Sequence, residues 1–104
     1  MPDDAEATPQ EAYAAIRDGA VLVDVREPWE YDQIRIPGSV LIPLGEVPAR
    51  LAEIPEGRDV YVHCRVGQRS GRAVEFLRAN GRPRSHNVMG GIDAWKEAGL
   101  PVAE

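Results

Sequence analysis

The residues best suited to chemistry lie in the segment 60–71, which reads VYVHCRVGQRSG. Its first residues favour a β-strand, and the spacing of apolar residues from Ser70 onward predicts a helix. Cys64, the one cysteine of the sequence, stands between them. We therefore expect loop amides and the positive end of the helix dipole to face its sulfur and to favour the thiolate over the thiol.

An ionised Cys64 would be a nucleophile with several uses. It could accept sulfur, attack a phosphate ester, exchange with a disulfide or react with peroxide. The amides of the loop also form a cradle of the kind that binds anions. A cysteine considered without its neighbours is more often a buried, unreactive thiol. The prediction of a functional cysteine therefore rests on its place between a strand and a glycine-containing loop.

The segment CRVGQRS, residues 64–70, resembles the active-site loop of the rhodanese family of sulfurtransferases, which often reads C-R-x-G-x-R-S. Three flanking segments are similar to other parts of that family in the expected order. They are VLVDVREPWEY (21–31), IPGSVLIPL (36–44) and NVMGGIDAWKEAGLPV (87–102). The resemblance implies a rhodanese-like three-layer α/β fold, with residues 8–104 as a single domain.

The resemblance also implies a reaction. In this family the cysteine thiolate attacks the outer sulfur of a donor such as thiosulfate, sulfite leaves, and a cysteine persulfide remains. Cyanide or a thiol then takes the outer sulfur. Cys64 is accordingly expected to be catalytic, with no metal and no organic cofactor. The expected partners are a small anionic sulfur donor and a thiol or protein that accepts sulfur.

The loop is expected to bind the substrate through its amides, which would hold the negative charge of the persulfide. The two arginines of the loop could also receive a dianionic donor through their guanidinium groups. Their alternative is an outward, solvated charge or an ion pair within the fold. The residues assigned to substrate binding are Arg65, Val66, Gly67, Gln68 and Arg69.

Three further residues, Asp24, Arg26 and Ser70, are expected to support the site rather than to bind substrate. Asp24 lies in an otherwise apolar segment, so its carboxylate needs a partner, and Arg26 is a candidate two residues further on. The pair also matches an Asp-x-Arg turn of the family. We interpret it as structural in preference to a substrate contact.

Two other hypotheses compete with sulfur transfer. Cysteine phosphatases of the tyrosine-phosphatase type carry H-C-x5-R-S, whereas residues 63–70 read H-C-x4-R-S. The shorter loop suits one sulfur atom better than a tetrahedral phosphate, and Asp93, a downstream candidate for the general acid, falls in a predicted helix. The other hypothesis is a non-catalytic rhodanese-like module that binds a protein, or a persulfide carrier that serves another protein.

The order of predicted elements positions these residues. Strands alternating with helices predict a mostly parallel sheet of about five short strands with helices on both faces. Ligands of such sheets bind outside the carboxyl ends of the strands, which is where Cys64 falls. Strands are expected at 21–25, 40–42, 59–63 and 85–89, and helices at 8–19, 28–31, 47–54, 70–80 and 92–98. Residues 1–7 are expected to be flexible.

Composition excludes several classes. The 104 residues suit one domain, and no apolar run approaches the ~20 residues of a membrane span. A single cysteine excludes an internal disulfide and a Cys-x-x-Cys site. The N-terminus lacks the features of a secretory signal, so we expect a cytoplasmic protein with no membrane partner.

Charge is unevenly distributed along the chain. The net charge is −5, which argues against nucleic-acid binding. Residues 58–84 nevertheless carry seven arginines against Asp59 and Glu75. Such a segment is either a solvated surface or an attractor of small anions.

Overall fold

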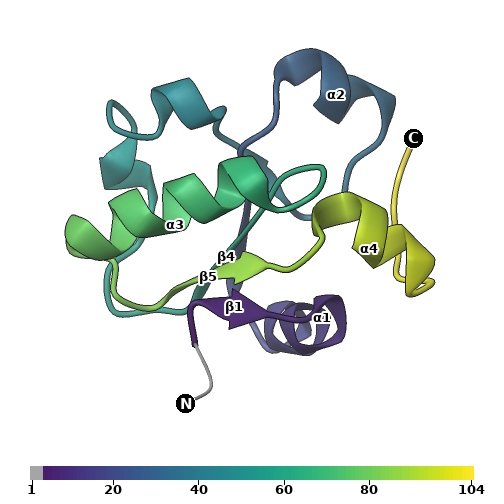
Figure 1. The fold of residues 1–104 in the computed structure, drawn as a ribbon, viewed down its shortest axis with the longest axis horizontal. Helices are drawn as coiled ribbons and strands as arrows, with labels where there is room; N and C mark the ends of the chain where they lie inside the picture. The colour runs from purple at the N-terminus through teal and green to yellow at the C-terminus, as the bar shows by residue number, and fades with distance from the viewer. Residues whose placement is uncertain (1–3) are drawn as a thin grey trace.

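The computed structural model describes residues 4–104, which form a parallel β-sheet between two layers of helices (Figure 1). The strands lie in the order β1-β5-β4-β2-β3, and every pairing between neighbours is parallel. They are β1 (Glu6–Ala7), β2 (Val21–Asp24), β3 (Val40–Leu41), β4 (Val60–His63) and β5 (Ser85–Val88). The predicted α/β class and its parallel sheet are confirmed.

Helices and 3₁₀ helices connect the strands and cover both faces. They are α1 (Pro9–Arg17), α2 (Pro28–Gln33), η1 (Leu44–Glu46), η2 (Leu51–Glu53), α3 (Gln68–Ala79) and α4 (Gly91–Glu97). One apolar core joins the sheet to α3 and the 3₁₀ segment, and includes Val62 and Leu77. A second core joins the other face to α1 and α4, and includes Leu22 and Trp95. The central strands β2 and β4 alternate their side chains between the two cores, which gives the three layers.

The helix expected at 47–54 is wrong, because the helical residues of this segment are Leu51–Glu53 alone, which form the 3₁₀ turn η2, and the other 3₁₀ turn, η1, ends before it at Glu46. Pro48 lies between η1 and η2, and proline has no N–H to donate to a helical hydrogen bond. The spacing of apolar residues still indicated the correct face. Val47 and Ile54 are both 1% exposed and belong to the core under α3.

The flexible N-terminus expected at 1–7 needs correction where the structure describes it, while residues 1–3 lie outside the described residues. Glu6–Ala7 form β1, which pairs in parallel with β5 at the edge of the sheet. The N–H groups of Asn87 and Met89 donate to the carbonyls of Ala5 and Ala7 at 2.6 and 2.8 Å. Backbone hydrogen bonds and the burial of Ala7 thus hold a segment that is too short to show a strand pattern in sequence.

Candidate active site

Cys64 lies directly after β4 and four residues before α3 begins, at the carboxyl end of the sheet. The loop turns at Gly67, whose φ of +102° belongs to the left-handed region that favours glycine. This turn aims the Gly67 N–H at the sulfur, with N and Sγ 3.1 Å apart. The predicted strand, loop and helix are present, and the helix begins two residues earlier than expected.

Two hydrogen-bond donors and the loop backbone surround a buried sulfur. Cys64 is 1% exposed, and the Ser70 hydroxyl lies 3.3 Å from Sγ. Burial raises the pKa of the Cys64 thiol. Hydrogen bonds from the Ser70 hydroxyl and from the N–H groups of Ser70, Gly67 and Val66 lower this pKa by more than burial raises it. The pKa of the thiol therefore lies below its ordinary value, and the thiolate is favoured.

The start of α4 holds the opposite side of the loop. The N–H groups of Ile92 and Asp93 donate to the carbonyls of Cys64 and Arg65 at 2.9 and 3.2 Å. Gly91 makes this approach possible, since its φ is +61° and a β-carbon there would lie 2.4 Å from both carbonyl oxygens. With its carbonyls bound to α4, the loop can turn N–H groups toward the sulfur.

Asp24 and Arg26 form a buried ion pair beside the loop. The Arg26 guanidinium donates to both carboxylate oxygens of Asp24, with a shortest distance of 2.8 Å, and the side chains of Arg26 and Asp24 are 3% and 0% exposed. Arg26 also donates to the carbonyl of Ile34 at 2.7 Å. The predicted partnership is confirmed, and these contacts fasten the end of β2 to the end of α2.

His63 ends β4, as expected, and is fully buried. Its Nε2 lies 3.5 Å from Asp24 Oδ2. Burial lowers the pKa of His63 and outweighs the carboxylate, which raises it, so the imidazole is neutral. His63 thus lies in a buried polar cluster with Asp24 and Arg26, on the other face of β4. It has no contact with the sulfur of Cys64 among those described.

The two loop arginines lie against carboxylates. Both terminal nitrogens of Arg69 donate to the Glu30 carboxylate, at 2.7 and 3.0 Å. Arg69 lowers the pKa of Glu30 to about 2, and burial opposes this shift. Arg65 is 68% exposed, with Nε 3.5 Å from Asp93 Oδ2. The alternative of an ion pair within the fold therefore describes Arg69, whose guanidinium binds Glu30 and not a sulfur donor.

Other arginines of residues 58–84 are also engaged outside the site. Their partners are a carbonyl or a carboxylate: Arg58 with Gly19, Arg78 with Asp4, Arg82 with Glu56 and Arg84 with Asp59. The positive charge of this segment is therefore spread over several surface contacts and does not gather around Cys64.

Sequence reasoning missed two residues of the site, Glu30 and Asn87. Asn87, in β5, is 5% exposed, and its Oδ1 accepts from the Ser70 hydroxyl. Its Nδ2 donates to the Gly67 carbonyl at 3.1 Å. A polar residue in a predicted buried strand was the available signal, since a buried amide must find partners. Ser70, expected in support, contacts the sulfur directly.

No helix of residues 4–104 is both long enough and apolar enough to cross a membrane. In the same part of the chain, no group of three or more His, Cys, Asp and Glu side chains is placed to hold a metal ion.

Comparison with known proteins agrees with the site. Residues 8–98 match the family model of the Rhodanese-like domain. A sulfurtransferase from Allochromatium vinosum is 44% identical over 82 residues, which cover 79% of this chain and 77% of that protein. A rhodanese-related protein from Thermoplasma volcanium superposes with a TM-score of 0.87 at 34% identity, covering 94% of this chain and 96% of that one.

Another relative is a longer protein, of which this chain matches only a part. The putative sulfur carrier protein YrkF from Bacillus subtilis is 40% identical over 74 residues, which cover 71% of this chain and 40% of that protein. The chain thus spans less than half of that relative. Together the matches confirm the resemblance that the loop and its flanking segments indicated.

Proposed function

The chain belongs to the rhodanese-like domain family, and from that premise we propose that it is a sulfurtransferase that carries sulfane sulfur as a persulfide on Cys64. The observation that supports this most is the surroundings of Sγ. The Gly67 N–H and the Ser70 hydroxyl face it, and the pKa of the thiol is lowered despite burial. A lowered pKa increases the fraction of thiolate, which is the nucleophilic form.

The proposed reaction has two displacements. The Cys64 thiolate attacks the outer sulfur of a donor such as thiosulfate, an S–S bond forms on Cys64, and the S–S bond of the donor breaks. Sulfite leaves with the bonding electrons. An acceptor, cyanide or a thiolate, then attacks the outer sulfur, and the Cys64 thiolate is released. No group other than donor, acceptor and Cys64 changes its bonding.

The loop backbone is the favoured stabiliser of the charged sulfur. N–H groups fixed by the fold do not have to reorganise when charge develops near them. We assign this role to the amides of residues 65–69. The guanidinium of Arg69 already binds Glu30, so we assign the charge of the donor to the loop amides and not to this side chain.

Mass spectrometry of the intact protein tests the persulfide. Incubation with thiosulfate should add about 32 Da, one sulfur atom, to the protein and nothing to Cys64→Ser. Cyanide should then remove this mass and release thiocyanate. If Cys64→Ser still converts thiosulfate and cyanide to thiocyanate, Cys64 is not the sulfur carrier and the proposal is wrong.

A persulfide carrier for a protein acceptor is the second candidate, supported by the similarity to a putative sulfur carrier. Multiple turnovers with thiosulfate and cyanide favour an enzyme, and loading once without turnover favours a carrier. An aryl phosphate in the same assay tests the phosphatase hypothesis, which predicts cleavage that depends on Cys64. A cytoplasmic location stays a prediction.

A further inference from the structure

The Ser70 hydroxyl has two acceptors but one hydrogen. Its Oγ lies 3.3 Å from Cys64 Sγ and 2.5 Å from Asn87 Oδ1. All three residues are buried, with exposures of 0%, 1% and 5% for Ser70, Cys64 and Asn87, so water does not readily replace either contact. A hydroxyl donates one hydrogen bond and can accept others. The sulfur and the amide oxygen therefore compete for the same hydrogen.

The contacts of Asn87 determine which atom of its amide faces Ser70. The nitrogen Nδ2 lies 3.1 Å from the Gly67 carbonyl and 3.3 Å from a carboxylate oxygen of Glu6. Both of these oxygens accept hydrogen bonds and neither donates, so the NH₂ group must face them. The oxygen Oδ1 is left toward Ser70, where it can only accept.

The charge of the sulfur decides the competition. In the thiol form, S–H donates to Ser70 Oγ, and the Ser70 hydrogen goes to Asn87 Oδ1, so all three groups are satisfied. When the thiol proton passes to water, the sulfur can only accept. The Ser70 hydrogen then turns to the charged sulfur, because hydrogen bonds to ions are the stronger ones, and Asn87 Oδ1 loses its donor.

From this geometry we propose that Asn87 is a positioning residue that acts on Cys64 through Ser70. Its amide oxygen holds the Ser70 hydrogen while the sulfur is uncharged and loses it when the sulfur ionises. A buried acceptor that loses its donor is costly. Asn87 thus opposes full stabilisation of the thiolate, whereas the Gly67 N–H and the Ser70 hydroxyl favour it.

This inference rests on the proposed function for its consequence in catalysis. Once Sγ carries a second sulfur, the negative charge has left Sγ, and the Ser70 hydrogen can return to Asn87. Asn87 would therefore favour the persulfide over the thiolate and assist the first displacement. A less stabilised thiolate is also the better nucleophile, since nucleophilicity rises with thiol pKa.

A bracing role for Asn87 predicts the opposite sign. If Asn87 acted only by holding the Gly67 carbonyl, its loss would loosen the loop, weaken the Gly67 N–H contact and raise the pKa of the Cys64 thiol. Competition for the Ser70 hydrogen predicts that loss of Asn87 lowers this pKa. The direction of one measured shift therefore separates the two roles.

The experiment is a titration of Cys64 in a double-mutant cycle of Asn87→Ala and Ser70→Ala. Thiolate absorbance in the far ultraviolet and alkylation rate against pH both report the pKa of the thiol. Asn87→Ala should lower it by roughly half a unit to one unit, the size of one net hydrogen bond. Its alkylation rate at high pH should fall about two- to threefold. In the Ser70→Ala background the same change should not lower the pKa.

Two further variants keep the test decisive if Asn87→Ala folds poorly. Asn87→Leu has a similar volume but no acceptor, so it should lower the pKa of the thiol as Asn87→Ala does, whereas loss of a brace would raise it. Glu6→Gln alters the exposed partner of Nδ2 but leaves Oδ1 in place, so the alkylation rate at high pH should not change.

The proposal is overturned if Asn87→Ala raises the pKa of the thiol or leaves it unchanged, if it lowers this pKa equally without Ser70, or if Asn87→Leu raises it. A change in the high-pH alkylation rate of Glu6→Gln as large as that of Asn87→Ala would also overturn the proposal. None of these titrations uses a sulfur donor. The role of Asn87 can therefore fail while sulfur transfer by Cys64 stands, and the reverse is equally visible.

Discussion

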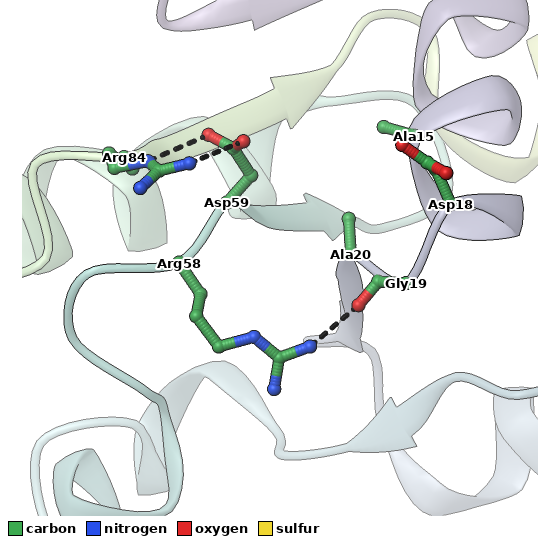
Figure 2. Close-up of a pocket in the computed structure, with 7 residues that line it drawn as sticks. All are labelled: Ala15, Asp18, Gly19, Ala20, Arg58, Asp59 and Arg84. Atoms are coloured by element: carbon green, nitrogen blue, oxygen red, sulfur yellow. Dashed lines mark hydrogen bonds and ion pairs between the residues drawn. The ribbon is translucent and has the colours of Figure 1, made fainter.

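The two ends of the parallel sheet carry the same kinds of residue but arrange them differently. Before β2, β4 and β5, at the amino end, lies a cavity of about 260 Å³ that is lined by charged side chains and turns (Figure 2). Arg84 binds both oxygens of Asp59, at 3.2 and 2.9 Å, and Arg58 donates to the Gly19 carbonyl at 2.6 Å. Arg84 and Asp59 thus neutralise each other, and Arg58 is held by a backbone carbonyl.

At the carboxyl end, backbone N–H groups converge on one sulfur. The difference follows from the direction of the helices in a parallel fold. The amino terminus of α3, rich in free N–H groups, lies beside Cys64, whereas the carboxyl terminus of α1, at Asp18, borders the opposite cavity. Positive dipole ends thus favour an anion at one end of the sheet only. Arginines are poor markers of the site here, and the direction of the backbone is a better one.

The largest expected difference between the two ends of the sheet is the effect of replacing a turn glycine by alanine. Gly91→Ala places a β-carbon 2.4 Å from the carbonyls of Cys64 and Arg65, so we expect a loss of roughly 3 kcal/mol or more and little remaining sulfur transfer. Gly19 also has a positive φ, of +100°, but a β-carbon there meets nothing within 4 Å. Gly19→Ala should cost about 1–2 kcal/mol from backbone strain, with activity retained.

Urea unfolding and the thiocyanate assay measure this pair of variants. Equal losses of stability in the two, or full activity in Gly91→Ala, would show that the approach of α4 to the loop does not maintain the site.

Removal of one carboxylate at each end should give a smaller contrast. The Glu30 side chain is 10% exposed and binds Arg69 through two bonds, so Glu30→Gln should cost about 1–2 kcal/mol. The Asp59 side chain is 41% exposed, and Asp59→Asn should cost less than about 1 kcal/mol because solvent screens the pair. Glu30→Gln should also free the charge of Arg69 and lower the KM for thiosulfate.

Steady-state kinetics with Asp59→Asn as the control tests the second part. A KM for thiosulfate that rises in Glu30→Gln, or that changes equally in both variants, would contradict a neutralising role of Glu30.

Acid titration of stability should show the smallest difference. Arg69 lowers the pKa of Glu30 to about 2, and Arg84, followed by His86, lowers that of Asp59 to about 2. Both folded values lie below the unfolded values of about 4. The stabilisation is therefore present above about pH 4 and is lost as the pH falls toward 2. Stability should decline over this range, and Glu30→Gln should flatten the decline more than Asp59→Asn.

Urea unfolding at a series of pH values gives these slopes. An unchanged slope in Glu30→Gln would mean that the unfolded and folded proteins hold this proton equally, and that the Arg69 contact does not stabilise the fold.

The parts of the site that the sequence could predict are those whose residues lie close together along the chain. Cys64, Gly67 and Ser70 lie within seven positions, so strand, turn and helix preferences place them without knowledge of the fold. Asp24 and Arg26 are two residues apart and pair as expected. Local rules work there because local geometry decides the contact.

The partners of Glu30 and Asn87 could not be predicted, because these residues lie far from their partners in the sequence. Glu30 meets Arg69 across 39 positions, and Asn87 meets Ser70 across 17. No periodic pattern states which of many polar side chains will face one another over such distances. The same limit applies to β1, whose two residues pair with β5 only once the rest of the sheet exists.

The pairing of β1 has a practical consequence for anyone who purifies this protein. Asp4 contacts Arg78, and Glu6 contacts the amide of Asn87 that faces Ser70, so the first described residues are linked to the hydrogen bonds around Cys64. A purification tag at this end could shift the titration that the experiments above measure. The choice of tagged end is therefore an experimental variable, and variants should be compared only on an identical leader.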